Sequence, residues 1–194
     1  LGSRESVNIV LIGYRCSGKT TVGKALARML SMQFIDTDQA VEKYSGRSID
    51  QIVLRSGWAQ FRALEKEVIS HAAAKDNLVI ATGGGVVLEK ENIVQLRKNG
   101  FTVWLKAPPR VIKERMAQDE LQGIRRPPLK GKNPVDEINR VLAERERLYE
   151  EAADLIVDTT SSDIERVCRI IIANMELING KGRTHGRQLY RQSL

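Results

Sequence analysis

The chain is poor in the residue types on which several classes of protein depend. Its 194 residues include two cysteines and two histidines, which provide neither a disulfide framework nor a set of zinc ligands. Aromatic residues make up 5% of the chain, which argues against stacking surfaces for single-stranded nucleic acid. No stretch approaches the roughly 20 apolar residues of a membrane-spanning helix. The composition therefore favours one domain in a reducing, cytoplasmic setting, with neither a membrane nor a nucleic acid as partner.

Positive charge is concentrated in two segments. The net charge is +7, but residues 106–132 carry eight Lys or Arg side chains against three acidic ones, and residues 181–194 carry four against none. A basic chain can indicate a nucleic-acid-binding protein. Because the rest of this chain is slightly acidic, we interpret the first cluster as a lid that faces phosphate groups and the second as a solvated extension. Nucleic-acid binding by the second segment is the alternative.

Short apolar segments of strand length alternate with segments of helical periodicity. The strand-like segments are Val7–Ile12, Gln33–Asp36, Leu78–Ala81, Thr102–Leu105 and Leu155–Val157. The helix-like segments are Thr20–Leu30, Ile49–Ala74, Asn92–Lys98, Pro109–Ala117, Val135–Ala153 and Ile164–Ile178. This alternation, with continuously apolar strands, predicts an α/β fold in which a parallel sheet lies between two helical layers. Ligands of such sheets bind at the carboxyl ends of the strands.

Two segments depart from this pattern. Residues 118–134 are dominated by Gly, Pro and charged residues, which predicts a mobile lid over a site, with a plain surface linker as the alternative. The chain from residue 179 onward is polar and basic, and we expect it to be disordered. The expected organisation is one domain over residues 1–178 and a basic tail over residues 179–194. No helix stands out as an interface, so a monomer is expected.

Residues 13–20 read Gly-Tyr-Arg-Cys-Ser-Gly-Lys-Thr and match G-x-x-x-x-G-K-[ST], the pattern of a phosphate-binding loop. In such a loop, backbone N–H groups surround the β-phosphate of a nucleotide, and the N-terminus of the next helix points at the same place. Gly13 and Gly18 permit torsions and a close approach that a Cβ would block. Lys19 can reach the β- and γ-phosphates, and the hydroxyl of Thr20 can ligate Mg²⁺.

Two acidic residues, Asp36 and Asp38, flank Thr37 after the second strand-like segment. Residues two apart in extended backbone face the same way, so both carboxylates are expected beside the phosphate-binding loop. One can hold the hydration shell of Mg²⁺, and the other can accept a proton from an attacking hydroxyl. The alternative is that either acid forms an Asx turn or caps a helix that begins near Gln39.

Three consecutive glycines, Gly83, Gly84 and Gly85, follow the third strand-like segment. A tight turn from a strand into a helix needs one glycine or two. A third glycine favours a segment whose bare backbone amides lie close to a ligand, and the tight turn is the alternative.

Arginines at helical positions are candidates for binding an acid. Arg62 and Glu65 are three residues apart and can pair on one helix face. This pair is either an ordinary surface ion pair or a guanidinium that Glu65 holds in place to grip a substrate carboxylate with two hydrogen bonds. Arg145, in a charge-rich helix, is equally ambiguous. In the predicted lid, an arginine of the segment Arg125–Pro128 can stabilise charge on a transferred phosphoryl group.

Taken together, these residues resemble shikimate kinase over about residues 7–178. The resemblance rests on an ordered series of motifs: Gly13-x4-Gly18-Lys19-Thr20, Asp36-Thr37-Asp38, Phe61-Arg62-x2-Glu65, Gly83-Gly84-Gly85, Arg126-Pro127 and Arg145-x3-Tyr149. It implies ATP-dependent phosphorylation of the 3-hydroxyl of shikimate, giving shikimate 3-phosphate and ADP, in aromatic amino acid biosynthesis. It also implies the P-loop fold of nucleoside monophosphate kinases, with a five-stranded parallel sheet in the order 2-3-1-4-5 and a closing lid.

The resemblance implies a role for each matched residue. The residues implied to bind ATP are Gly13, Cys16, Ser17, Gly18, Lys19, Thr20, Thr21, Arg115 and Arg126. Those implied to bind shikimate are Asp38, Arg62, Gly83, Gly84, Gly85 and Arg145, with the two arginines on its carboxylate. Thr20 and Asp36 are implied to support Mg²⁺. The implied catalytic residues are Lys19, Asp38 as the base and Arg126 as the lid arginine.

The chain departs from the family pattern in its lid, and two other functions stay open. The lid reads Arg-Arg-Pro-Pro-Leu, so Arg125 competes with Arg126 for the catalytic position. The segment between Arg115 and Arg126 is also longer than the resemblance leads us to expect. One alternative is another small-molecule P-loop kinase, such as gluconate kinase, against which the triple glycine and the acid-binding arginines argue. The other is a non-catalytic kinase-like binding module, against which the intact phosphate-binding loop and its two acids argue.

Overall fold

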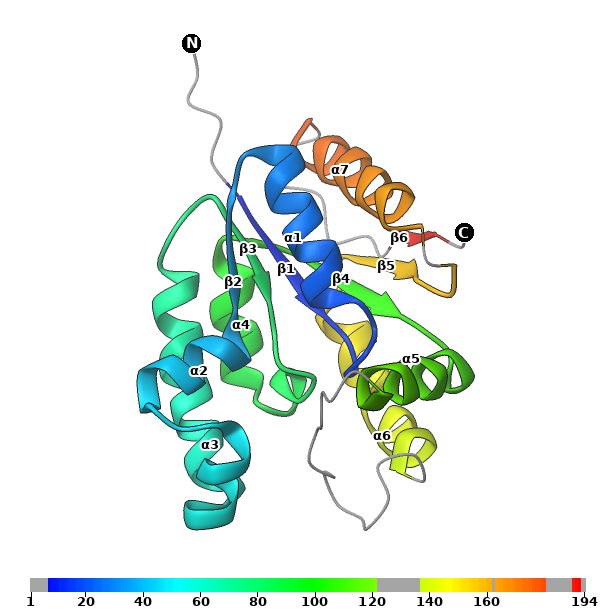
Figure 1. The fold of residues 1–194 in the computed structure, drawn as a ribbon. Helices are drawn as coiled ribbons and strands as arrows, with labels where there is room; N and C mark the ends of the chain where they lie inside the picture. Colours follow the sequence, from blue (N-terminus) through cyan, green and yellow to red (C-terminus); the bar gives the residue numbers. More distant parts are fainter. Residues whose placement is uncertain (1–6, 122–136, 162, 181–189, 193–194) are drawn as a thin grey trace.

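A parallel β-sheet lies at the centre of the molecule and carries helices on both faces (Figure 1). The computed structural model describes residues 7–121, 137–161, 163–180 and 190–192. The strands are β1 (Asn8–Ile12), β2 (Gln33–Asp36), β3 (Leu78–Ala81), β4 (Gly100–Lys106), β5 (Leu155–Asp158) and β6 (Tyr190–Gln192). They lie in the order β2-β3-β1-β4-β5-β6, and every neighbouring pair is parallel. The five predicted strands and their order, 2-3-1-4-5, are confirmed.

The outermost strand, β6, comes from the tail that we expected to be disordered. Tyr190–Gln192 pair in parallel with residues 155–157 of β5. The structure corrects the expectation for these three residues. The physical reason is that β5 would otherwise leave a row of backbone N–H and C=O groups unpaired, and an extended segment of any side-chain composition can pair with them.

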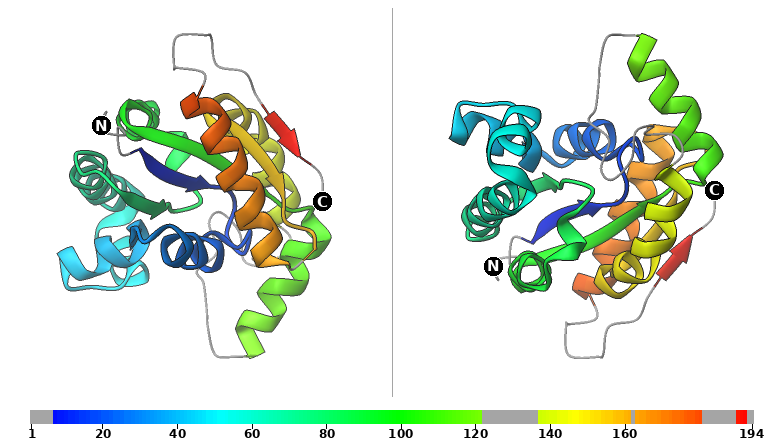
Figure 2. Two further views of the ribbon diagram at one scale, coloured as in Figure 1. Left: turned by 90° about the horizontal axis from the view of Figure 1, so that it is seen from above. Right: turned by 90° about the horizontal axis from the view of Figure 1, so that it is seen from below.

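Helices cover the two faces of the sheet in separate layers. They are α1 (Lys19–Leu30), α2 (Thr37–Ser45), α3 (Ile49–Ala73), α4 (Lys90–Lys98), α5 (Pro109–Leu121), α6 (Glu137–Ala152) and α7 (Ile164–Gly180), with a short 3-10 helix, η1 (Val86–Leu88). In β1, Ile9 and Leu11 pack with α1 and α7, whereas Val10 and Ile12 pack with α3, α4 and α6. Figure 2 shows α1 and α4 on opposite sides of the sheet. Burial on both faces explains why the strands are continuously apolar.

Helix α2 was expected only as an alternative, a helix beginning near Gln39, and its presence changes the interpretation of the two acids. Asp36 is its N-cap: Oδ1 accepts hydrogen bonds from the backbone N–H of Asp38 (3.1 Å) and of Gln39 (3.3 Å). Asp38 therefore lies in the first turn of a helix, and our argument from extended backbone was wrong. The alternative that we left open, a helix cap, is confirmed for Asp36.

The lid prediction falls largely outside the described residues. Residues 118–121, which we assigned to the lid, instead continue helix α5. Residues 179 and 180, which we assigned to the disordered tail, likewise continue helix α7. The remainder of the predicted lid, with Arg125 and Arg126, lies outside the described residues, and so do residues 181–189 and 193–194 of the predicted tail. Among the helices that are described, none is long and apolar enough to cross a membrane.

A buried amide ties the sheet together at the end opposite to the carboxyl ends of the strands. Asn8, which is 2% exposed, donates from Nδ2 to the carbonyl oxygen of Lys75 (2.6 Å). Its Oδ1 accepts from the backbone N–H of Leu78 (2.9 Å). These two hydrogen bonds fix the start of β1 against the start of β3.

We expect Asn8→Ala to lower the free energy of unfolding by about 1–3 kcal/mol, because it removes the partner of the buried N–H of Leu78 and that of the carbonyl of Lys75. Urea unfolding followed by circular dichroism measures the change. A variant as stable as the wild type contradicts this account of the sheet.

Candidate active site

A cavity of about 830 Å³ lies at the carboxyl ends of the central strands. In Figure 1 this is the side on which α2 and α3 stand opposite α5 and α6. The predicted site residues that line it are Cys16, Ser17, Gly18, Lys19, Thr20, Thr21, Asp36, Asp38, Arg62, Gly83, Gly84, Gly85, Arg115 and Arg145. Gly13 is buried and does not line the cavity, and Arg126 lies outside the described residues.

The phosphate-binding loop has the strained backbone that its function requires. The φ angles of Gly13, Cys16 and Gly18 are 142°, 59° and 96°. A Cβ at Gly13 would lie 2.6 Å from the carbonyl oxygen of Leu105 and 2.9 Å from Oγ of Ser17, so glycine is needed there for space as well as for torsion. Gly18 is the N-cap of α1, which places the positive end of that helix in the loop.

The ammonium group of Lys19 lies over the loop itself. Nζ donates to the carbonyl oxygens of Gly13 and Tyr14, both at 2.8 Å, and the side chain is 8% exposed. This places a positive charge at the phosphate-binding loop, beside the N-terminus of α1. The arrangement suits an anion with several oxygens, such as the phosphates of a nucleotide.

A hydroxyl and a carboxylate lie together beside the loop. Oγ1 of Thr20 donates to Oδ2 of Asp36 at 2.8 Å, while Oδ1 of Asp36 caps α2. Asp36 can therefore cap α2 with one carboxylate oxygen and face Thr20 in the site with the other. Within the described residues no group of three or more His, Cys, Asp or Glu side chains could hold a metal ion. One hydroxyl and one carboxylate fit Mg²⁺, which is commonly held by one or two protein groups together with water and substrate phosphates.

The ion pair of Arg62 and Glu65 is not an ordinary surface pair. Nη1 of Arg62 donates to Oε2 of Glu65 at 2.5 Å, and the side chain of Glu65 is only 1% exposed. The guanidinium also lies over the rings of Trp58 and Phe61, at 5.8 Å and 5.0 Å from their centroids. Arg62 itself remains 18% exposed and lines the cavity. The structure thus contradicts the surface interpretation and agrees with a guanidinium held in a fixed orientation.

The second carboxylate oxygen of Glu65 has no hydrogen-bond partner among the residues that the structure describes. Burial raises the pKa of this carboxyl, the positive charge of Arg62 lowers it in part, and the nearby carboxylate of Asp38 raises it further. The net effect is a pKa above the ordinary value of 4.5. Glu65 is therefore a buried acid whose charge depends on its arginine partner.

The triple glycine leaves room for the side chains of the site. A Cβ at Gly83 would lie 2.5 Å from Oδ1 of Asp38 and 2.9 Å from Oε1 of Glu65, and one at Gly85 would collide with the guanidinium of Arg62. The backbone N–H of Gly83 is already used, because it donates to Oγ1 of Thr37 at 3.0 Å. We expected all three amides to be available to a ligand, and for Gly83 this is wrong. Ligand contact through the amides of Gly84 and Gly85 stays a prediction.

Arg145 enters the site from α6. It is 5% exposed, and Nη1 donates to the carbonyl oxygen of Gly84 at 2.9 Å. The same carbonyl accepts a hydrogen bond from the hydroxyl of Tyr149 at 2.5 Å. Both arginines that the sequence left ambiguous therefore line the cavity, and each is held in position by a hydrogen bond to the protein.

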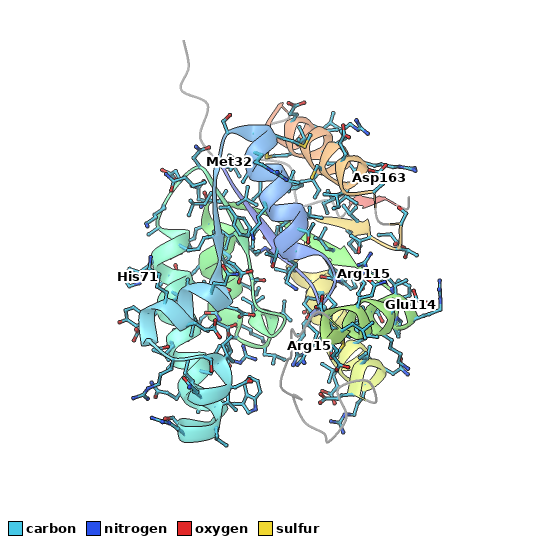
Figure 3. All side chains as sticks on the ribbon, in the orientation of Figure 1. Arg15, Met32, His71, Glu114, Arg115 and Asp163 are labelled. Carbon is cyan, nitrogen blue, oxygen red and sulfur yellow. The ribbon has the colours of Figure 1, made fainter. Side chains whose placement is uncertain are left out.

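Arg115 connects three segments at the nucleotide end of the cavity. It donates from Nη1 to the carbonyl oxygen of Cys16 (3.2 Å) and from Nη2 to that of Thr159 (2.5 Å). In Figure 3 it lies beside the start of α1, whereas His71 is on the outer side of α3. The sequence offered no role for His71, and the structure places this residue away from the site.

Two buried threonines of the site were missed from the sequence. Thr37 is fully buried and binds the glycine segment, and Thr159, which is 3% exposed, donates from Oγ1 to the carbonyl oxygen of Ser17 at 3.1 Å. Thr37 stood in the motif Asp36-Thr37-Asp38 without a role of its own, and the signal for Thr159 was its position at the carboxyl end of a strand.

Comparison with known proteins agrees with this geometry. A sequence model of the shikimate kinase family matches residues 15–176. Shikimate kinase of Caldanaerobacter subterraneus is 44% identical over 174 residues, which cover 90% of this chain and 99% of that protein. The solved structure of shikimate kinase from Acinetobacter baumannii in complex with shikimate matches with a TM-score of 0.82 and 30% identity, over 90% of this chain and 95% of that one. The solved structure of shikimate kinase from Aquifex aeolicus matches with a TM-score of 0.74 and 36% identity, over 90% of this chain and 99% of that one.

The raised pKa of Glu65 predicts a pH dependence of stability. The folded state binds this proton more tightly than the unfolded chain does. Protonated Glu65 therefore contributes to the stability of the fold fully below the ordinary pKa, and this contribution is lost as the pH rises through the raised pKa. Glu65→Gln is neutral at every pH and lacks this loss. We therefore expect the stability of the wild type relative to Glu65→Gln to fall as the pH rises from the ordinary pKa of 4.5 through the raised pKa of Glu65. Urea unfolding at several pH values tests this, and a relative stability that rises with pH contradicts it.

Proposed function

The chain belongs to the shikimate kinase family and phosphorylates the 3-hydroxyl of shikimate with ATP, and from the geometry of its site we propose the role of each residue in that reaction. One observation carries the proposal. A single cavity holds a phosphate-binding loop and two fixed arginines, Arg62 and Arg145. An acid bound at the arginines therefore lies in the same cavity as the terminal phosphate of a nucleotide bound at the loop.

The two arginines bind the carboxylate of shikimate. Each guanidinium has five N–H donors, and the bonds to Glu65 and to Gly84 occupy one nitrogen of each. The donors that remain have the planar fork that matches a carboxylate. Since both guanidiniums are held by the protein, little rotational freedom is lost when the acid binds.

Asp38 accepts the proton of the reacting hydroxyl. It lies in the first turn of α2, next to Gly83 and Glu65 at the acid-binding end of the cavity. Phosphoryl transfer asks the protein mainly to position the reactants and to stabilise charge. A carboxylate that meets the 3-hydroxyl supplies the one proton acceptor that the reaction needs.

The nucleotide is bound at the other end of the cavity. The loop amides and Lys19 bind its phosphates, and Arg115 with the loop around Thr160 flanks its base. Thr20, and Asp36 through water, would hold Mg²⁺, which supplies positive charge to the phosphates when it is bound. That Arg126 rather than Arg125 is the lid arginine, that the chain is a monomer and that it is cytoplasmic stay predictions.

An assay of ADP release with shikimate, quinate and gluconate as acceptors tests the function. We expect ATP turnover that depends on shikimate and a product that carries the phosphate on the 3-hydroxyl. Preferred turnover of gluconate would support the alternative of a different small-molecule kinase. Binding of ATP and shikimate without phosphate transfer would support a binding module instead.

We expect Asp38→Asn to lower kcat by about 10²–10⁴-fold, the usual range for loss of a general base, with a small change in the KM for shikimate. Steady-state kinetics measures both values. The matched control is Asp163→Asn, because among the described residues the carboxylate of Asp163 accepts from the backbone N–H of Arg166 at an exposed helix start and does not line the cavity. A variant in which only the KM changes would show that Asp38 binds the substrate without acting as the base.

A further inference from the structure

One carbonyl oxygen in the glycine segment accepts two hydrogen bonds from helix α6. The hydroxyl of Tyr149 donates to the carbonyl of Gly84 at 2.5 Å, and Nη1 of Arg145 donates to the same oxygen at 2.9 Å. The two residues are one helical turn apart, so α6 presents both donors on one face. Of these two donors the arginine lines the cavity, whereas the tyrosine does not.

The hydroxyl of Tyr149 is a permanent donor in a fixed place. The residue is fully buried, and its ring stacks on that of Trp104 in β4, with centroids 5.5 Å apart and an interplanar angle of 22°. Burial raises the pKa of the phenol to about 12, so the oxygen keeps its proton at neutral pH. The ring cannot turn away without disturbing the core between α6 and the sheet.

The fixed carbonyl determines how the next peptide group is oriented. In a planar trans peptide the C=O and the following N–H point in opposite directions. With the carbonyl of Gly84 directed at α6, the N–H of Gly85 is directed away from α6. The bond from Gly83 to Thr37 holds the preceding residue from α2. The glycine segment is thus held from two helices that face each other across the cavity.

We propose that Tyr149 is a positioning residue of the acid site, which acts through the carbonyl of Gly84 on the guanidinium of Arg145 and on the amide of Gly85. The inference rests on the proposed function, because it assumes that this end of the cavity binds the acid. Packing alone does not require the hydroxyl, since phenylalanine fills the same volume. A buried hydroxyl is unfavourable unless it is hydrogen-bonded, and here the hydroxyl interacts with the carbonyl of Gly84 and with the side chain of Arg145.

Tyr149→Phe removes only the oxygen atom and tests the proposal. We expect the KM for shikimate to rise about three- to tenfold, as for the loss of one hydrogen bond, while the KM for ATP and kcat change less than about twofold. Asn8→Ala is the control, because it removes buried hydrogen bonds at the opposite end of the sheet and should leave both KM values unchanged. An unchanged KM for shikimate, or equal increases for both substrates, would overturn the proposal and leave Tyr149 as a core residue only.

A double-mutant comparison tests the shared acceptor. Arg145→Lys alone should raise the KM for shikimate, and if both residues act through one carbonyl, the effect of Tyr149→Phe in that background should be clearly smaller than in the wild type. Independent, multiplicative effects would contradict the mechanism. The wild-type assay separates this inference from the function: a wild type inactive on shikimate overturns both, whereas an active wild type with an unaffected Tyr149→Phe overturns only the positioning role.

Discussion

A buried ion pair determines much of the local structure of this site. Glu65 is a carboxylate without solvent contact, and a charge in such a place is tolerated only when a partner of opposite sign is held against it. Arg62 is that partner. The same ion pair also fixes the guanidinium of Arg62 at the cavity wall. The glycines at 83 and 85 follow from it, since a Cβ at either position would occupy the space of the pair.

The sheet explains how such distant parts of the chain form one site. The phosphate-binding loop follows β1, Asp36 ends β2, and the glycine segment follows β3. Because these three parallel strands are adjacent, the three features meet at one edge of the sheet. Helices α3 and α6 then bring Arg62 and Arg145 close to the glycine segment. The nucleotide end depends on the helix start at Gly18, and the acid end depends on side chains from two helices. This division places an anion site and an acid site in one cavity, as a small-molecule kinase needs.

The parts of this arrangement that are local in sequence could be predicted. Periodicity gave the strands, and the spacing of Gly13, Gly18 and Lys19 gave the loop, because both are determined by neighbouring residues. Helix α2 was expected only as an alternative because its cap, Asp36, is also the last residue of a strand. The burial of Glu65 depends on packing against residues distant in the chain and leaves no local pattern. Strand β6 could not be predicted because its pairing depends on an open sheet edge.

The central claim is that Arg62 and Arg145 bind the carboxylate of shikimate and thereby direct its 3-hydroxyl at Asp38. A crystal structure of the protein with shikimate and ADP tests this most directly. The account predicts carboxylate oxygens about 2.7–2.9 Å from guanidinium nitrogens of both arginines, with the 3-hydroxyl in hydrogen-bond contact with Asp38. An acid bound away from the two arginines, or a ring turned so that another group faces Asp38, would contradict it.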